Sequence, residues 1–337
     1  MSAAPTTDAN WLPDRSAPLV GRRAESVWLN SLAVVTAAVG AVVAIVGLFS
    51  GAPAPVEVES VRGLAVQLYG SGVYRYDTLF TGAGNRGTDL VTLAVGVPLM
   101  IGCLIAVRKG SARGRLLMPG AFAWFLYVYS TMSVGAAYNQ LFLAYVALFA
   151  ISIFGGALAL RAVDTATLIA QAHALPKRWP GWLLVVSGIA TPFIWVSPVV
   201  AGLVAGAVPD RLDTYSTFVT TALDVAIITP AALIAGVLVL KGRGLGFVMA
   251  VPLLVIEGAL APVIAAQTVF QRGAGIDFAP AELVGPIGAF MTLSGMAVAA
   301  LVLIVKAVKS PQGSLMAADT VPPSRRTPLT GRPSSTP

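Results

Sequence analysis

Eight long apolar stretches separated by short polar links dominate the pattern along this chain. They cover residues 27–49, 88–107, 116–137, 141–160, 181–206, 218–240, 245–267 and 283–305. About 20 helical residues cross a hydrocarbon core about 30 Å thick, and each stretch reaches that length. The pattern predicts an all-α fold, a polytopic integral membrane bundle of about eight transmembrane helices surrounded by the lipid bilayer.

The polar segments divide the chain into three parts. Residues 1–26 have no apolar periodicity and are predicted to be a flexible leader before the eight-span domain, 27–306. Residues 307–337 are rich in Pro, Ser and Thr, a composition typical of a disordered tail. The basic start, the first apolar run and Ala52-Pro53-Ala54 resemble a cleaved signal peptide. However, an apolar signal region is only about 7–15 residues long, which favours an uncleaved first span.

The longest link, 50–87, has a pattern of its own. The apolar spacing over 61–68 predicts a short amphipathic helix, and Thr88 is the predicted N-cap of the second span. We expect the loop to be ordered and to fold over the end of the bundle, because it combines Tyr and Arg with carboxylates in reach. A second amphipathic helix is predicted over 162–174.

The distribution of basic residues predicts the topology. All but five of the 22 Lys and Arg residues fall on one side of the bundle when the spans are counted alternately. The five on the other side are Arg62, Arg75, Arg86, Arg211 and Arg272. This is the positive-inside pattern of a multi-pass protein of the cell (plasma) membrane with both termini in the cytoplasm. The net charge of +7 is therefore a topology signal. No aromatic-interleaved basic patch indicates nucleic acid as a partner.

The two halves of the chain share landmarks. Pro98 in the second span precedes Lys109-Gly110 by eleven residues, and Pro230 in the sixth span precedes Lys241-Gly242 by the same distance. A 4+4 internal duplication would produce this pattern, as in transporters built from parallel repeats. Chance similarity between membrane helices is the alternative.

Composition narrows the candidate chemistry. Hydrophobic residues make up 56% of the chain and charged residues 11%, against about 25% charged in soluble domains. The single cysteine, Cys103, and the single histidine, His173, give no disulfide and no Cys/His metal site. The sequence has no nucleotide-binding loop, HExxH or GxSxG motif, so we predict neither a metal nor a cofactor.

Ionisable residues inside the membrane are costly and often functional. Glu257 lies near the middle of the seventh span and Asp224 lies two turns inside the sixth. Both are candidates for a site that binds a ligand or a proton. A neutral acid bonded to a neighbouring helix is the alternative for Glu257, and helix capping or an interfacial position is the alternative for Asp224. Pro252 and Pro262 flank Glu257 and predict a bend there.

A second set of polar residues is expected to meet at the outer end of the bundle. An Arg–Asp lock that holds the loop in place, or an anion site, would explain it. The candidate outer-loop polar cluster consists of Tyr74, Arg75, Asp77, Arg86, Asp89, Tyr138 and Asn139.

These features leave three hypotheses for function. The first is a protein that binds or transports a small molecule or ion through an outward-facing cavity lined by Glu257, Asp224 and the loop 50–87. The second is a non-catalytic interaction or sensor component recognised through that loop. The third is a membrane-embedded enzyme that acts on a lipid or lipid-linked substrate. The oligomeric state is left open.

Overall fold

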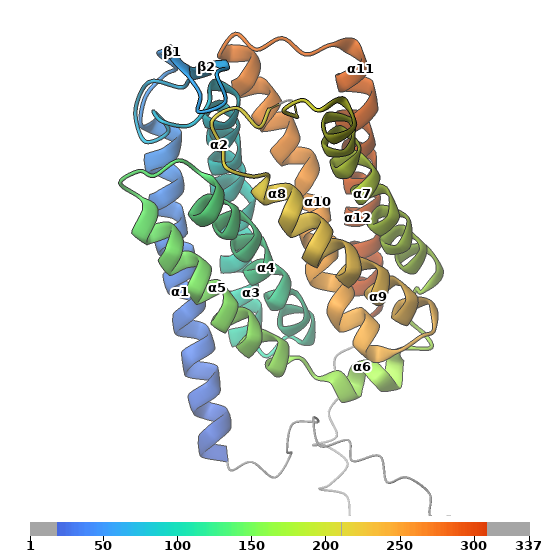
Figure 1. The fold of residues 1–337 in the computed structure, drawn as a ribbon. Coiled ribbons are helices and arrows are strands. Elements are labelled where there is room, and N and C mark those ends of the chain that lie inside the picture. Colours follow the sequence, from blue (N-terminus) through green and yellow to red (C-terminus); the bar gives the residue numbers. More distant parts are fainter. Residues whose placement is uncertain (1–18, 210, 309–337) are drawn as a thin grey trace, which may run out of the picture.

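The computed structural model describes residues 19–209 and 211–308, with side chains from Ser26 onward. Long helices run side by side, and a small β hairpin lies at one end of the bundle (Figure 1). We call this the hairpin end and the opposite end, where α6 lies, the terminal end. Most of the predicted leader and tail lie outside the described residues, so these two assignments remain predictions.

The N-terminal half holds four helical stretches and the hairpin. Its elements are α1 (Leu19–Phe49), β1 (Val56–Glu59), β2 (Ala65–Leu68), α2 (Leu79–Val91), the π-helical turn η1 (Thr92–Gly96), α3 (Val97–Arg108), α4 (Ala112–Gly135) and α5 (Phe142–Ala162). The short helix α6 (Thr165–Gln171) links the halves. The C-terminal half contains α7 (Arg178–Ala205), α8 (Val219–Leu223), η2 (Asp224–Ile228), α9 (Thr229–Leu240), α10 (Gly244–Gly273), α11 (Pro280–Glu282), η3 (Leu283–Ile287) and α12 (Gly288–Ala307).

All eight predicted spans are continuous helical stretches, so the all-α polytopic membrane bundle is confirmed. In the described residues, seven of the stretches are long and apolar enough to cross a membrane. The exception is α4, a helix of 24 residues that carries Ser and Tyr among its apolar positions. Most of its residues are buried against other helices, including Phe122 and Phe125. A helix surrounded by protein needs less hydrophobicity than one that faces lipid, which explains the difference.

Each half forms a ring of four helical stretches. In the first ring α1 contacts α2, α3 and α5, while α4 contacts α3 and α5. In the second ring α7 contacts α9 and α12, and α10 contacts the same two helices. The halves are joined mainly through α10, which also packs against α2 and α4. The position of α10 in the middle of the bundle is visible in Figure 1.

Each of the two rings contains a π-helical turn just before a proline. Residues 92–96 and 224–228 form π-helical turns, each followed within two residues by a proline, Pro98 or Pro230. Proline removes one helical hydrogen bond, and the wider turn lets the preceding residue donate to the carbonyl five positions back. The Val97 N–H donates to Thr92 and the Thr229 N–H donates to Asp224.

The helices that follow these two turns, α3 and α9, also have similar C-terminal ends. Gly110 and Gly242 both have a positive φ, +77° and +66°, directly after a C-terminal lysine. The three N–H groups at each end donate to carbonyls in the same register: Lys109 to Ile105, Gly110 to Val107 and Ser111 to Ala106, matched by Lys241 to Val237, Gly242 to Val239 and Arg243 to Leu238. This agreement and the matching rings are what a duplication would produce, and the duplication itself stays a prediction.

The loop prediction is correct in outline and wrong in two details. Residues 61–68 do not form an amphipathic helix. Val56–Glu59 and Ala65–Leu68 pair as an antiparallel hairpin, with Val56 opposite Leu68. Alternating Val and Glu suits a strand, and Gly63 turns the chain at φ +73°. The second span is capped by Thr78 and not by Thr88, so it begins nine residues earlier than predicted. The predicted second amphipathic helix corresponds to α6, capped by Asp164.

Small residues permit the contact between α2 and α10. A Cβ added at Gly87 would lie 2.4 Å from the backbone nitrogen of Gln267, too close for any side chain. The Gln267 side chain donates to the Thr88 hydroxyl at 2.9 Å, and Gln271 donates to the Phe80 carbonyl at 3.1 Å. The closeness of the two backbones thus also positions the polar contacts between the halves.

We therefore expect Gly87→Ala to destabilise the fold by about 1–3 kcal/mol, because the new methyl group must push α2 from α10. The matched control is Gly102→Ala in α3, where no atom lies within 4 Å of the added Cβ. Thermal unfolding of the purified protein in detergent measures both. Equal midpoints for Gly87→Ala and Gly102→Ala would contradict the close contact.

Candidate functional site

Asp224 and Glu257 come from different helices and line the same cavity. Asp224 is the first residue of the turn η2, and Glu257 lies in the middle of α10 between Pro252 and Pro262. The cavity has a volume of about 50 Å³, which is room for a few water molecules or one small polar group. The sequence reasoning proposed each acid separately and did not predict that they face a common space.

The cavity lies within the second ring and is closed on one side by the first half. Its walls come from α7, η2, α9, α10 and α12, and from one residue of α4. The lining residues are Tyr127, Leu184, Ser187, Gly188, Thr191, Asp224, Ile228, Thr229, Ala232, Leu253, Ile256, Glu257, Leu260, Phe290 and Leu293. The predicted contribution of the loop 50–87 to this cavity is wrong, since every described lining residue comes from a helix beyond it.

The carboxyl group of Asp224 lies beside two side chains that can donate to it. Tyr127 of α4 and Trp195 of α7 interact with this carboxyl group, although Trp195 Nε1 forms no well-aligned hydrogen bond. Only 7% of Asp224 is exposed. The π-helical turn supports this position, because the Asp224 carbonyl accepts from Thr229 five residues on and the helix widens at the acid.

Glu257 has a less complete set of partners. Ser187 of α7 interacts with its carboxyl group, while the Ser187 hydroxyl itself donates to the Leu184 carbonyl at 3.3 Å. Glu257 Oε1 and Thr229 Oγ1 are buried and have no hydrogen-bond partner among the described residues. Buried polar atoms are normally paired, and these two unpaired atoms lie on the wall of one cavity that has room for a small polar group.

In the first ring, the position that corresponds to Glu257 is occupied by a packed aromatic side chain. In the register that aligns Pro98 with Pro230, Phe125 corresponds to Glu257 and Thr92 to Asp224. Phe125 is fully buried in the core of the first ring. A Cβ added at Gly40 of α1 would lie 2.5 Å from its ring, so the two helices enclose it tightly. Aromatic packing thus fills the first ring, whereas the second keeps a polar cavity.

α10 is held next to the cavity by a residue of α12. Pro262 cannot pair with the Gly258 carbonyl in the usual helical way. The buried hydroxyl of Ser294 donates to that carbonyl at 2.8 Å and accepts from the Ala261 N–H at 2.9 Å. Ser294 therefore satisfies the backbone that the proline disrupts, one residue from Glu257. The described α10 is one continuous helix through Pro252 and Pro262.

The predicted outer-loop residues lie at the hairpin end, where most of them form hydrogen bonds within the protein. The Tyr74 hydroxyl donates to Asp89 at 2.6 Å, and both side chains are buried. Arg86 donates to the Leu48 carbonyl through Nε and Nη2, at 3.1 and 2.8 Å, and to the Tyr69 hydroxyl at 3.0 Å. The loop is thus docked as predicted, but these arginine contacts go to oxygens other than those of the expected aspartates.

The remaining members of this set have local partners. Arg75 donates to the Gly72 carbonyl at 3.1 Å, and its guanidinium lies 5.6 Å from the Tyr76 ring centre. Asn139 accepts from the Leu141 N–H at 2.9 Å and so orders the start of α5. Tyr138 is 77% exposed and its ring lies against Phe142. These seven residues do not converge on one cavity, which separates them from Asp224 and Glu257.

Asp77 links three segments at the hairpin end. Its Oδ1 accepts from the Ala137 N–H and from the Tyr215 hydroxyl, both at 2.8 Å. Ala137 belongs to the α4–α5 link and Tyr215 to the α7–α8 link, so one carboxyl group joins the hairpin segment to both. Burial raises the pKa of Asp77 to about 6, and these two hydrogen bonds oppose that shift only in part.

Sequence reasoning missed the uncharged members of the site, Tyr127, Ser187, Thr191, Trp195 and Thr229. Isolated hydroxyls and indoles are common in membrane helices, so nothing in the linear pattern distinguished them. The sequence did contain one signal for the location of the site. Asp224 lies six residues before Pro230 and therefore in the π-helical turn that precedes this proline.

The described residues offer no group of three or more His, Cys, Asp or Glu side chains that could hold a metal ion. No protein-family model, no curated protein and no solved structure matches this chain. Fold and cavity together define a multi-pass α-helical membrane protein with an acid-lined cavity between its helices.

Docking of the hairpin segment should depend on pH through Asp77. The docked carboxyl group keeps its proton to a higher pH than an exposed one, so the docked state weakens as pH rises from about 4 to about 6. The difference amounts to at most about 3 kcal/mol. Hydrogen exchange of residues 50–78, corrected for intrinsic rates, should show stronger protection at pH 5 than at pH 7.5.

Asp77→Asn keeps the accepting oxygen and removes the titration, so its protection should change little between the two pH values. Glu59→Gln, an exposed carboxyl on the same hairpin, is the control and should behave like the unaltered chain. Equal protection of the unaltered protein at both pH values would contradict the role of Asp77.

Proposed function

We propose that the protein binds a small ligand in the cavity between Asp224 and Glu257 and transports it across the membrane. The observation that carries this proposal is the pair of acids on the wall of one cavity, with Glu257 Oε1 and Thr229 Oγ1 left without partners. An uncompensated polar group in this setting is unfavourable, and a site for a ligand or proton is a reason to keep it.

The contrast with the hairpin end supports the proposal. There the buried Asp89 has a hydrogen bond from Tyr74, and Arg86 has carbonyl and hydroxyl acceptors. Glu257 differs from Asp89 because its Oε1 has no partner and faces a cavity, although its helix packs against helices of both halves.

The helices around the cavity are also suited to movement. η2 is a π-helical turn, α7 contains Pro192 and Pro198, and α10 contains Pro252 and Pro262. Such features lower the resistance of a helix to bending. Two rings with equal topology resemble the parallel repeats from which some transporters are built, with sites near the membrane midplane.

The alternatives make different demands. An interaction or sensor component would need neither acid, so replacement of Glu257 would leave its activity intact. An enzyme that acts on lipid would need a cleft for the scissile group beside the two carboxyls, whereas the cavity of about 50 Å³ suits one small group.

The test is ion flux through the purified protein in liposomes that contain a pH-sensitive dye. Under an imposed pH gradient, the unaltered protein should carry protons, because a transport cycle would expose the two acids to each side of the membrane in turn. Glu257→Gln preserves shape but cannot titrate, and it should reduce the flux at least tenfold.

Glu59→Gln, on the exposed hairpin, serves as the matched control and should retain full flux. Flux that is the same for Glu257→Gln and the control would refute the proposal, provided that both variants insert and purify alike. Glu257→Leu, if it is fully active, would refute it as well.

We further propose that the hairpin end faces outward in the plasma membrane and that both chain ends are cytoplasmic. The support is the location of the basic links: Arg108, Lys109, Arg113, Arg115, Lys177, Arg178, Lys241 and Arg243 all belong to the terminal end. Positive residues are retained on the cytoplasmic side.

Cysteine labelling tests this orientation in intact cells. Val61→Cys on the hairpin, where the native residue is 95% exposed, should react with a membrane-impermeant maleimide. Lys109→Cys on the α3–α4 link should react only after the cells are opened. Native Cys103 is buried and serves as the unlabelled background. The reverse labelling pattern would overturn the assignment.

A further inference from the structure

The link between α7 and α8 contacts both halves of the molecule at the hairpin end. We call its described residues, 206–209 and 211–218, the strap. In Figure 1 it runs from the end of α7 toward the β hairpin and returns to α8. α7 supplies Ser187 and Thr191 to the cavity wall, and α8 leads directly into Asp224. The strap therefore joins two walls of the candidate site.

One part of the strap is bonded to the hairpin segment of the first half. The Tyr215 hydroxyl donates to Asp77 Oδ1 at 2.8 Å and accepts from the Thr78 N–H at 3.3 Å. Arg62, in the turn of the hairpin, donates to the Asp213 carbonyl at 3.2 Å. These contacts hold the strap against the segment that precedes α2.

Arg211 connects the strap to one helix of each half. Its Nη2 lies 2.5 Å from Glu282 Oε1 of α11, and its guanidinium carbon lies 4.2 Å from the ring centre of Phe80 in α2. Glu282 is fixed in turn, because its Oε2 accepts from the Ala279 N–H at 2.9 Å. Phe80 packs against Phe278, with ring centres 6.4 Å apart. A single guanidinium group thus contacts α2 and the start of the last helical stretch.

The strap has a strained backbone that is held by weak contacts. Arg211 and Asp213 have φ values of +66° and +48°, a region that residues other than glycine seldom adopt. Such conformations persist only where the surrounding contacts hold them. The side chains of Arg211 and Glu282 are 45% and 40% exposed, and an exposed ion pair adds little stability because water and salt screen it. Release of the strap is therefore inexpensive and relieves strain.

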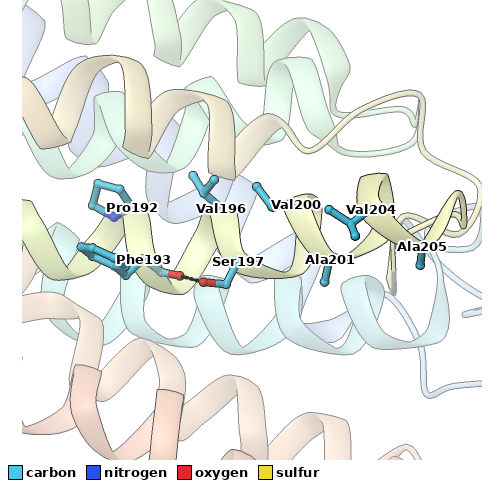
Figure 2. A pocket seen from close by; sticks show the side chains of 8 residues that line it. All are labelled: Pro192, Phe193, Val196, Ser197, Val200, Ala201, Val204 and Ala205. Carbon is cyan, nitrogen blue, oxygen red and sulfur yellow. Dashed lines mark hydrogen bonds between the residues drawn. The ribbon is translucent and has the colours of Figure 1, made fainter.

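The half of α7 that leads into the strap is suited to move with it. Figure 2 shows its side chains over 192–205, which border a hollow of about 740 Å³ on one face of this helix alone. Phe193 and Val204 are 71% and 84% exposed, whereas Leu184 in the preceding half is buried where α7 packs against α9. Pro192 lies between the two halves and removes a helical hydrogen bond, which permits a bend there.

We propose that the strap is a gate between the acid-lined cavity and the hairpin end, held closed in this structure by the contacts of Arg211 with Glu282 and Phe80. When Arg211 releases these partners, the strap and residues 192–205 of α7 move away from the first half. The cavity then opens toward the hairpin end, because α7 forms part of its wall. This inference rests on the proposed function, since a transport site must be reached from each side in turn.

The reactivity of a cysteine in the cavity tests the gate. Thr191→Cys places a thiol on the cavity wall, and its reaction with the water-soluble reagent aminoethyl methanethiosulfonate is timed in the purified full-length protein in lipid nanodiscs. Adding Arg211→Gln removes the ion pair and the contact with the Phe80 ring, so the reaction should become at least fivefold faster. Arg272→Gln, an exposed arginine at the same end of the bundle, is the matched control and should leave the rate unchanged. Equal rates for Arg211→Gln and Arg272→Gln overturn the gate.

A second variant separates opening of the gate from unfolding. Glu282→Gln should also speed the reaction of Thr191→Cys, and the double variant should react no faster than Arg211→Gln alone, because both changes remove the same ion pair. Effects that multiply overturn the ion pair as the contact that holds the gate. Native Cys103 is buried and should stay unreactive in every variant. Reaction of Cys103 in both single variants would show general loosening and overturn the gate.

The gate and the proposed function fail in different experiments. Proton flux that depends on Glu257, in a protein whose cavity cysteine reacts at the same rate with and without Arg211, leaves transport in place and removes the gate. Flux that is equal for Glu257→Gln and Glu59→Gln removes the proposed function, and with it the reason for a gate, whatever the rates of cysteine reaction.

Discussion

In the hydrocarbon core, a backbone N–H or C=O group without a partner costs several kcal/mol, and the rest of this structure depends on avoiding that cost. Prolines inside helical stretches create the problem repeatedly. Two π-helical turns solve it at Pro98 and Pro230, where the residue before the proline donates five positions back. At Pro262 a side chain does the same work, because Ser294 bonds both Gly258 and Ala261. Asp224 and Glu257 of the candidate site lie next to these alternative backbone hydrogen bonds.

The two four-helix rings have the same arrangement of helices but different interiors. The first is filled by aromatic and sulfur-containing side chains such as Phe125, Tyr129 and Met100, and it presents a solid wall to its partner. The second keeps a small polar cavity, with Tyr127 from the first ring as part of its wall. The interior of the first ring is thus packed with side chains at the level where the second ring holds a cavity.

Buried acids divide into two kinds in this molecule. Asp77 and Asp89 each accept hydrogen bonds from tyrosine hydroxyls and hold the hairpin segment on the bundle. Glu257 keeps a buried oxygen without a partner, beside an Asp224 whose neighbours come from α4 and α7. Asp77 Oδ2 is also buried without a partner, so an unpaired oxygen alone does not mark the candidate site. What distinguishes Asp224 and Glu257 is that both line one cavity between the helices.

The sequence by itself determined the fold class, the eight helical stretches, the docking of the loop and the two intramembrane acids that line the candidate site. Twenty apolar residues in a row leave a chain few choices in a bilayer, and a lone carboxyl within such a run stands out. Residues 61–68 were misjudged as a helix because an apolar spacing over eight residues fits either secondary structure, and the partner strand decides. That Asp224 and Glu257 share one cavity was decided by tertiary structure alone. It depends on how α7, α9, α10 and α12 close into a ring, and on Tyr127 reaching across from a helix more than a hundred residues away from Glu257. Such contacts arise from packing between distant segments, and no local pattern records them.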